Sequence, residues 1–248
     1  MVSHSSCNDS PAFIARFFEL LPELGTGAAA FADGRPLGAA YLLTAQELVE
    51  GDRRRRCGYL YAVAVEEDAR RRGLGGELSR AAAALWRARG AELLCTMPAE
   101  RGLYAWYERQ LGLRCALRRE RRDLESRPGA EPLLLSAAEY GLRREALLRN
   151  KPHMALSPAG LLLEEANCRL FGGGLYALDG GIAAAYVHEG VTEVRELLGA
   201  PPEAAAALGA ALGTEKTRLW LPAREGEPYL AFAPDDLPAD TVWNLAFD

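Results

Sequence analysis

A run of arginines and glycines in the first half of the sequence has the residue types and spacing of an anion-binding turn. The run consists of Arg70, Arg71, Arg72, Gly73, Leu74, Gly75 and Gly76. Glycines at the start of a helix let backbone N–H groups approach a ligand closely, and the helix N-terminus favours negative charge. The arginines add positive charge for phosphate oxygens. We therefore expect a phosphate-binding turn, and the alternative is a tight surface turn with solvated arginines.

Two other phosphate-binding patterns do not fit this turn. A P-loop needs Gly-Lys-Ser/Thr, which does not follow here. Leu78 stands where a dinucleotide-binding fingerprint needs its third glycine. The spacing that remains is Arg70-x-x-Gly73-x-Gly75.

The elements around the turn form a mixed α/β pattern. The apolar run at residues 58–65 predicts a buried strand, and the apolar positions of residues 77–89 repeat with helical spacing. A short strand at residues 92–97, a helix around residues 103–110 and a strand starting at Leu113 follow. The turn is thus expected where a strand meets a helix.

This arrangement, over residues 27–115, resembles the GNAT superfamily of N-acetyltransferases, whose motif is Arg/Gln-x-x-Gly-x-Gly/Ala. The resemblance implies that the turn from Arg70 to Gly76 binds the pyrophosphate of acetyl-CoA through backbone amides. It also implies that the strand before the turn pairs with the pantetheine arm through the backbone of Val63, Ala64 and Val65. No metal is required by this chemistry.

The second marker of the family is a tyrosine before a Gly-aromatic pair. Here Tyr107 precedes Gly112 and Leu113, one residue further away than usual and with leucine for the aromatic residue. By resemblance, Tyr107 protonates the departing CoA thiolate, a role that suits a phenol. Tyr104, three residues earlier on the same helical face, is the competitor. The alternative is that both tyrosines are core aromatics beside Trp106.

The sequence departs from the family in two places. Some members carry a glutamate base six residues before the position of Val65, and this residue is Tyr59 here. Glu47, Glu50 or Asp52 on the preceding segment, or a chain of waters, are the remaining candidates, so the base is unassigned. The first strand and helix of the family also lack a counterpart before Pro11, so we expect the sheet to start late or to borrow a strand.

The N-terminal elements and one loop are predicted as follows. Residues 11–24 have helical apolar spacing with start signals at Asp9 and Ser10, and residues 27–32 and 36–43 flank an Asp-Gly turn typical of a hairpin. The charged segment at residues 46–56 is expected to be a loop.

The second half of the chain repeats this order of elements. Residues 126–132 contain two prolines and a glycine and are interpreted as a linker, which places an acetyl-CoA-binding domain at 1–125 and a related domain at 126–248. The elements expected there are strands at 133–135, 174–178, 182–187, 191–197 and 217–221, and helices at 137–149, 158–169 and 202–212. Trp243, Leu245 and Phe247 alternate as in a half-buried strand.

The second half has no cofactor turn. After its matching strand, residues 196–203 contain two prolines and no Arg-x-x-Gly-x-Gly pattern. The glycine run at residues 171–177 precedes a hairpin instead of a helix, so it is interpreted as a strand entry. We therefore expect a degenerate GNAT-like domain that packs against the first and walls the substrate cleft. The predicted fold class is α/β, an α+β mixed sheet, with two such domains, each a mostly antiparallel sheet flanked by helices.

Composition excludes several classes of protein. The chain has 248 residues, 49% hydrophobic and 25% charged, which is typical of a globular protein and not of a disordered or fibrous one. The net charge of −5 divides into +2 for residues 1–125 (19 Arg, 17 Asp+Glu) and −7 for residues 126–248 (10 Lys+Arg, 17 Asp+Glu). No global basic surface for nucleic acid is expected. The acidic second half suits a cationic amine, although a solvated acidic surface is the commoner explanation.

Cysteine use and apolar runs indicate a cytoplasmic protein. The five cysteines are scattered, and none forms a Cys-x-x-Cys pair, which favours reduced thiols over disulfides or zinc. No apolar run reaches the length of a membrane span, and the first ten residues have no secretory pattern. The sequence leaves homodimer formation open.

The sequence thus predicts an acetyl-CoA-dependent N-acetyltransferase that acts on a primary amine of a small molecule or peptide, by direct attack in a ternary complex. One alternative is a non-catalytic acyl-CoA-binding or regulatory module, favoured by the missing glutamate at position 59. The other is a structural or interaction protein that binds no CoA.

Overall fold

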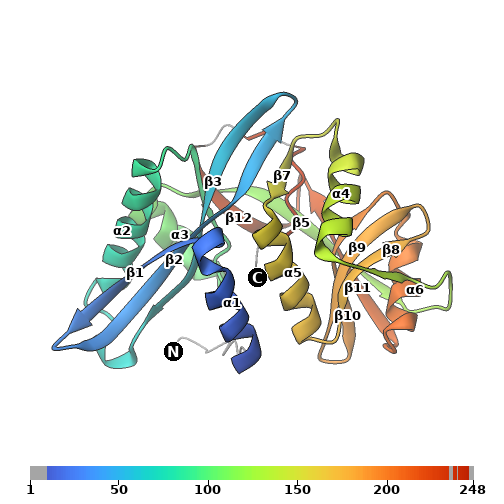
Figure 1. Ribbon diagram of the computed structural model, residues 1–248, viewed down its shortest axis with the longest axis horizontal. Helices are drawn as coiled ribbons and strands as arrows, with labels where there is room; N and C mark the ends of the chain where they lie inside the picture. Colours follow the sequence, from blue (N-terminus) through green and yellow to red (C-terminus); the bar gives the residue numbers. More distant parts are fainter. Residues whose placement is uncertain (1–9, 235–236, 239, 246–248) are drawn as a thin grey trace.

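The computed structural model describes residues 10–234, 237–238 and 240–245 (Figure 1). The first half contains α1 (Pro11–Leu24), β1 (Gly25–Ala32), β2 (Arg35–Glu50), β3 (Arg53–Val65), the 3-10 turn η1 (Glu67–Ala69), α2 (Leu74–Ala88), β4 (Leu93–Thr96), α3 (Arg101–Leu111) and β5 (Arg114–Glu125). The second half contains β6 (Leu133–Leu135), α4 (Ala137–Leu148), β7 (His153–Leu156), α5 (Pro158–Leu170), β8 (Gly174–Leu178), β9 (Gly181–His188), β10 (Val191–Leu198), α6 (Glu203–Ala211), β11 (Lys216–Ala223) and β12 (Glu227–Ala233).

The strands form one sheet, not the two separate sheets predicted from the sequence. The sheet has 12 strands in the order β1-β2-β3-β4-β12-β5-β11-β10-β9-β8-β6, with β7 paired to β2 off this path. The β3–β4 and β10–β11 pairs are parallel and the other pairs are antiparallel. The mixed α/β class is therefore confirmed, whereas the division into one sheet per half is wrong.

The cause is the position of β12. This strand comes from the second half of the chain but lies between β4 and β5 of the first half (Figure 1). Its residues Leu230, Ala231 and Phe232 are buried, so they need neighbouring strands and covering side chains on both sides. Strand β5 continues past β12 and pairs with β11, which joins the two halves of the sheet. Strand β12 is not among the elements predicted from the sequence. At the outer edge the sheet starts late, with β1 after α1.

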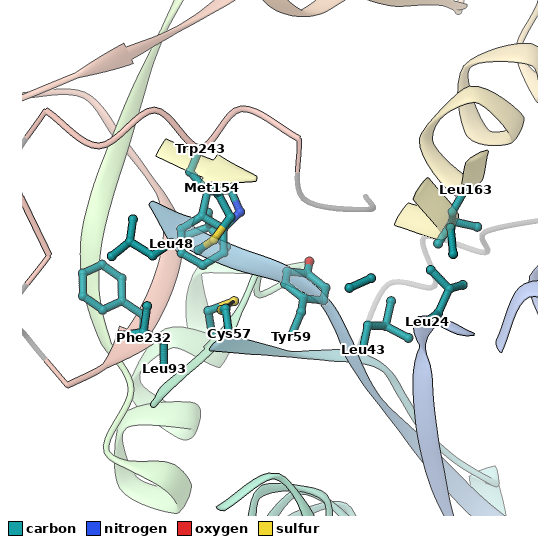
Figure 2. Packing of buried hydrophobic residues seen from close by; sticks show 14 of the residues in the cluster. Leu24, Leu43, Leu48, Cys57, Tyr59, Leu93, Met154, Leu163, Phe232 and Trp243 are labelled. Carbon is teal, nitrogen blue, oxygen red and sulfur yellow. Dashed lines mark hydrogen bonds between the residues drawn. The ribbon is translucent and has the colours of Figure 1, made fainter. Parts of the chain in front are cut away.

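The predicted loop at residues 46–56 is wrong, because these residues extend β2 and β3 into a long hairpin. Glu47 and Arg54 form an ion pair across it at 3.3 Å, and Glu50 holds Arg55 at 3.0 Å. Strand β7 adds to the outer side of β2, with Leu48 opposite Met154. Figure 2 shows Met154 and Trp243 packed over Leu48, which is fully buried. The charged pattern therefore belongs to cross-strand pairs and not to a solvated loop.

The N-terminal helix is confirmed at its predicted bounds. The Ser10 hydroxyl accepts a hydrogen bond from the Phe13 N–H at 3.1 Å, and Pro11 occupies the first turn, where its missing N–H costs nothing. Phe13 and Phe17 are buried against the sheet and α5. The helix thereby covers the sheet face opposite α2 and α3.

The segment between the predicted domains packs closely on α6. The Arg127 N–H donates to the Ala206 carbonyl at 3.1 Å, and a Cβ at Gly129 would lie 2.6 Å from the Ala207 Cβ. These contacts hold the linker against the middle of α6. The predicted domain boundary remains a prediction.

The C-terminal segment is buried without being a strand. Trp243 and Leu245 are buried, but Val242 forms just an isolated bridge with His153 within residues 240–245. Phe247 lies outside the described residues. No helix among the described residues is both long and apolar enough to cross a membrane.

Candidate functional site

The glycine turn lies at the end of β3 and leads directly into α2. Arg71 and Gly73 adopt left-handed backbone conformations with φ of 63° and 85°, and Gly73 is the N-cap of α2. The helix starts at Leu74, three residues before the predicted start, because the turn glycines themselves form its first turn. The N–H groups of this first turn have no acceptor within the helix. They therefore point out of the helix end as donors for a ligand.

A cavity of about 490 Å³ lies against this helix end. Of the predicted cofactor residues, those lining it are Val65, Arg70, Arg71, Gly73, Leu74, Gly75 and Gly76. Val63, Ala64 and Arg72 do not line it. A Cβ at Gly75 would meet no backbone, just the side chains of Val65 at 3.7 Å and Trp106 at 3.9 Å. A longer side chain at Gly75 would therefore enter the cavity instead of disrupting the fold.

Four lining residues were not anticipated as binding residues from the sequence: Ala69, Arg80, Trp106 and Gln110. Arg80 of α2 donates a hydrogen bond to the Gln110 side chain of α3, which closes the far side of the cavity. Arg80 lies two turns into α2, so helical spacing from Gly73 could have indicated it. Gln110 and Trp106 depend on how α3 packs against α2, for which the sequence carries no local signal.

Ion pairs organise the charges of the turn. The Arg70 side chain donates from Nε to the Val65 carbonyl at 2.9 Å and thus fixes the turn to the end of β3. Asp68 accepts two hydrogen bonds from Arg35, at 2.8 and 3.2 Å, and this contact holds the pKa of Asp68 below its usual range. Because Arg35 compensates Asp68, the exposed Arg71 and Arg72 keep the turn attractive to anions.

Strands β3 and β4 pair over a short length next to the cavity. Residues 57–59 pair in parallel with residues 93–95, and the Thr96 hydroxyl donates to the Leu60 carbonyl at 2.9 Å. Strand β4 ends at Thr96, whereas β3 continues to Val65. A bulge at Ala62, with φ of 48°, bends β3 at this point. Residues 63–65 therefore run on beyond the end of β4, with one backbone edge not covered by it.

Tyr107 lies at the point where β4 ends. It is 7% exposed and packs edge-on against Trp106, and Thr96 is near enough to its phenol to affect its pKa. Burial raises the pKa of Tyr107, and the Thr96 contact opposes this in part. The phenol is therefore a protonated donor beside the gap between the two strands.

Tyr104 has a different environment, although it is three residues away on α3. Its hydroxyl donates to the backbone carbonyls of Pro228 and Tyr229 of β12, at 2.9 and 3.0 Å. These bonds tie α3 to the strand supplied by the second half of the chain.

The candidate bases lie away from the gap between β3 and β4. Glu47 pairs in register with Arg56, five residues before Tyr61, a span of about 16 Å along β3. Glu50 is bonded to Arg55 nearer the hairpin tip, and Asp52 is in the tip turn itself. At the position of the expected glutamate, Tyr59 is buried, and burial raises its pKa well above the usual value.

No group of three or more His, Cys, Asp or Glu side chains suited to a metal occurs among the residues that the structure describes. Cys57 and Cys95 lie on adjacent strands with their Sγ atoms 3.6 Å apart, and Cys168 is a buried thiol. Cys7 lies outside the described residues.

Comparison with protein families gives one match, over residues 3–113, to the Acetyltransferase (GNAT) family. We refer to the region that matches this family as the GNAT domain. The match contains the glycine turn, the end of β3 and both tyrosines, and it ends before β5 and β12, which complete the sheet of this GNAT domain. A comparison with curated protein sequences gives no match.

Solved structures share the fold of nearly the whole chain. A GCN5-related N-acetyltransferase from Kribbella flavida is 17% identical with a TM-score of 0.65, and the alignment covers 92% of this chain and 65% of that one. Eis1 from Mycobacterium abscessus is 20% identical with a TM-score of 0.56, covering 88% and 66%. A tandem GNAT protein from the clavulanic acid biosynthesis pathway is 13% identical with a TM-score of 0.51, covering 91% and 88%. The chain spans slightly less than two thirds of the first two proteins.

These similarities extend the GNAT fold beyond the matched domain. Because a tandem GNAT protein aligns with 91% of the chain, the second half also follows a GNAT-like order of elements. In this half, α6 begins at Glu203 with Pro202 as its N-cap and has no glycine turn.

Proposed function

We propose that the protein is an acetyl-CoA-dependent N-acetyltransferase whose cosubstrate binds to the GNAT domain. The observation that carries this proposal is the cavity at the N-terminus of α2, which is bounded by the left-handed turn and by Val65 at the end of β3. A helix end with free N–H groups and adjacent arginines suits a pyrophosphate, and an uncovered strand edge suits the amides of a pantetheine arm.

Each part of the site has a distinct role in this proposal. The backbone of Gly73, Leu74, Gly75 and Gly76 holds the pyrophosphate, with Arg71 and Arg72 supplying charge. The backbone of residues 63–65 holds the pantetheine arm and orients the acyl carbonyl. When bound, acetyl-CoA supplies the activated thioester that an amine attacks directly.

Tyr107 is the proposed general acid. Its hydroxyl lies where β3 and β4 part, and its raised pKa keeps the proton available for a departing thiolate. Tyr104 is the less suitable candidate, because its proton is engaged by two backbone carbonyls. Most of the rate enhancement then comes from positioning the amine and the thioester together.

Calorimetric titration of acetyl-CoA into the wild type and Gly75→Glu tests the cofactor site. This substitution would place a side chain and a negative charge in the cavity, so we expect binding to the wild type and none to the variant. Gly102→Glu is the matched control, because Gly102 is also in a helix and a Cβ there would meet nothing within 4 Å. Failure of the wild type to bind, or equal binding by Gly75→Glu, contradicts the proposal.

A non-catalytic acyl-CoA-binding module is the second candidate, because Tyr59 replaces the expected carboxylate and Glu47, Glu50 and Asp52 lie away from the gap. A steady-state assay of CoA release with a panel of primary amines separates the two functions. Release above the amine-free rate supports the enzyme, and binding without release supports the module.

A further inference from the structure

A second cavity, of about 240 Å³, lies where the two halves of the sheet meet. Its walls come from β5 and β12 of the GNAT-domain sheet, from β10 and β11 of the second half, and from residues 240–244. It lies on the sheet face that carries Leu117, Tyr229 and Trp243, opposite α2 and α3. None of its residues belongs to the cofactor site described above.

The lining of this cavity is strongly cationic. Its arginines are Arg118, Arg119, Arg195 and Arg224, and Asp240 is the one carboxylate among the described residues that line it. Arg195 is compensated by the buried Glu164 at 3.6 Å. This contrasts with the acidic charge of the second half, so the overall charge does not predict the ligand of this site.

Arg119 is the cation best placed to bind a ligand here. Its guanidinium lies 4.0 Å from the ring centre of Trp220 and 4.8 Å from that of Tyr229, which hold it by cation–π contacts. Its Nε is buried and has no hydrogen-bond acceptor among the described residues. Burial lowers the pKa of Arg119, as expected for a cation that has lost water without gaining a carboxylate partner.

The indole of Trp243 supplies a second donor. Trp243 is 2% exposed, lines the same cavity, and its Nε1 has no acceptor in the part of the chain that the structure describes. Figure 2 shows this side chain above Leu48 and Met154 in the adjoining core. A buried N–H without a partner is costly, and two of them at one cavity indicate a ligand that brings acceptors. A carboxylate matches this need, because it has two acceptor oxygens and the charge opposite to Arg119.

The cavity shares two lining residues with another cavity, which lies near the end of β4. Arg119 and Tyr229 also line a neighbouring cavity of about 190 Å³, together with Met97 and Tyr104. Met97 directly follows Thr96, and its backbone amide bonds to the Tyr59 hydroxyl. Strand β12 alone separates β4 from β5, so Arg119 lies on a strand about 10 Å from β4. A small molecule anchored at Arg119 can thus extend toward the gap.

We propose that this cavity binds the carboxylate of the acceptor, through the guanidinium of Arg119 and the indole N–H of Trp243. The acceptor is then an amine that also carries a carboxylate, such as an amino acid or a short peptide. The assignment of the ligand as acceptor rests on the proposed acetyltransferase function, whereas the carboxylate site itself rests on the cavity.

Matched acids and amides test the carboxylate site by calorimetry. The probes are the N-acetyl derivatives of phenylalanine, leucine and lysine, each as free acid and as amide, titrated into the wild type, Arg119→Met and Arg122→Met. Methionine keeps an apolar stem without the charge, and Arg122 is an exposed arginine of the same strand that does not line the cavity. We expect at least one acid to bind about tenfold or more tightly than its amide, with the preference lost in Arg119→Met and kept in Arg122→Met.

A second variant covers the case in which Arg119→Met does not fold. Asp240→Asn removes the carboxylate of the lining, which repels an acid. Acids should therefore bind more tightly to this variant, whereas the affinity for amides should not change. The proposal is overturned if no acid binds, if acids and amides bind alike, or if folded Arg119→Met keeps the preference.

Acetyl-CoA is titrated into the same samples to separate the two proposals. If acetyl-CoA does not bind, the proposed function fails, and the acid–amide difference still decides the carboxylate site. If acetyl-CoA binds but acids and amides do not differ, the carboxylate site fails and the proposed function stands. If the wild type acetylates free amino acids in preference to their amides, and Arg119→Met loses this preference, the ligand of the carboxylate site is the acceptor.

Discussion

At the scale of single residues, the two tyrosines of α3 lie three positions apart but have different environments, one suited to catalysis and one to holding the fold together. Tyr107 is inside, in contact with Thr96 at the end of β4. Tyr104 points toward β12 and its hydroxyl donates to two backbone carbonyls of that strand. Their spacing in the sequence leaves the two equivalent, since both lie on one helical face. The surrounding strands make them different.

Tyr107→Phe should lower kcat by about 100-fold or more, because general acids typically contribute that much, with little change in acetyl-CoA affinity. Since burial raises the pKa of Tyr107, its ionisation should not reduce wild-type kcat below about pH 10. A steady-state assay across pH, with calorimetry for affinity, measures both effects. Tyr104→Phe is the control, with kcat near the wild-type value and stability lower by about 1 kcal/mol. If Tyr104→Phe lowers kcat and Tyr107→Phe does not, Tyr104 is the general acid instead.

At the scale of elements, the hairpin of β2 and β3 decides how the halves are joined. The outer part of β2 is covered by β7, and Leu48 lies in a core that includes Met154 and Trp243 from the second half (Figure 2). The charges that suggest a loop lie on the hairpin surface as cross-strand pairs. This element is thus both a strand of the GNAT domain and a support for the second half.

Leu48→Ala should reduce the free energy of unfolding by about 2–5 kcal/mol, because it opens a cavity in a fully buried site. Urea denaturation followed by circular dichroism measures the loss. Leu142→Ala is the matched control, because Leu142 is 76% exposed and its truncation should cost little. Equal, small losses for both variants would show that β7 does not stabilise the hairpin.

Elements with local signals were predictable from the sequence, and those defined by distant partners were not. Helix α1 has a serine cap, a first-turn proline and apolar periodicity, all within 15 residues, and its predicted bounds agree with the structure. Strand β7 has four residues, and β12 contains Pro228 at a bulge, so neither has a clear alternating pattern. Likewise, the glycine turn is local, whereas Arg119 and Trp243 become neighbours only through the folded sheet.

At the scale of the whole molecule, the continuous sheet makes the two halves interdependent. The GNAT match ends at residue 113, but the sheet that supports the turn needs β12, which begins at Glu227. Strand β5 pairs with β12 along its first part and with β11 along the rest. Separating the two halves of the chain therefore breaks strand pairing in the middle of a sheet, because the halves are not joined by a flexible hinge.

Residues 1–125 expressed alone should not form a cooperative, monomeric domain, since β4 and β5 would expose unpaired edges. Size-exclusion chromatography and thermal unfolding measure this, with the full chain as the reference. Coexpression with residues 126–248 should restore a soluble complex, because β12 is then available. A fragment 1–125 that unfolds cooperatively as a monomer would disprove the requirement for β12.

The insertion of β12 also sets the timing of folding during synthesis. Roughly 100 residues separate the end of β5 from the start of β12, so at about 5–20 residues per second the ribosome needs about 5–20 s to supply the last strand. Domains usually fold in the order of their translation, but the GNAT domain of this chain is made first and completed last. Throughout that interval β4 and β5 lack the strand that separates them, so we expect the nascent chain to be prone to aggregation until β12 emerges.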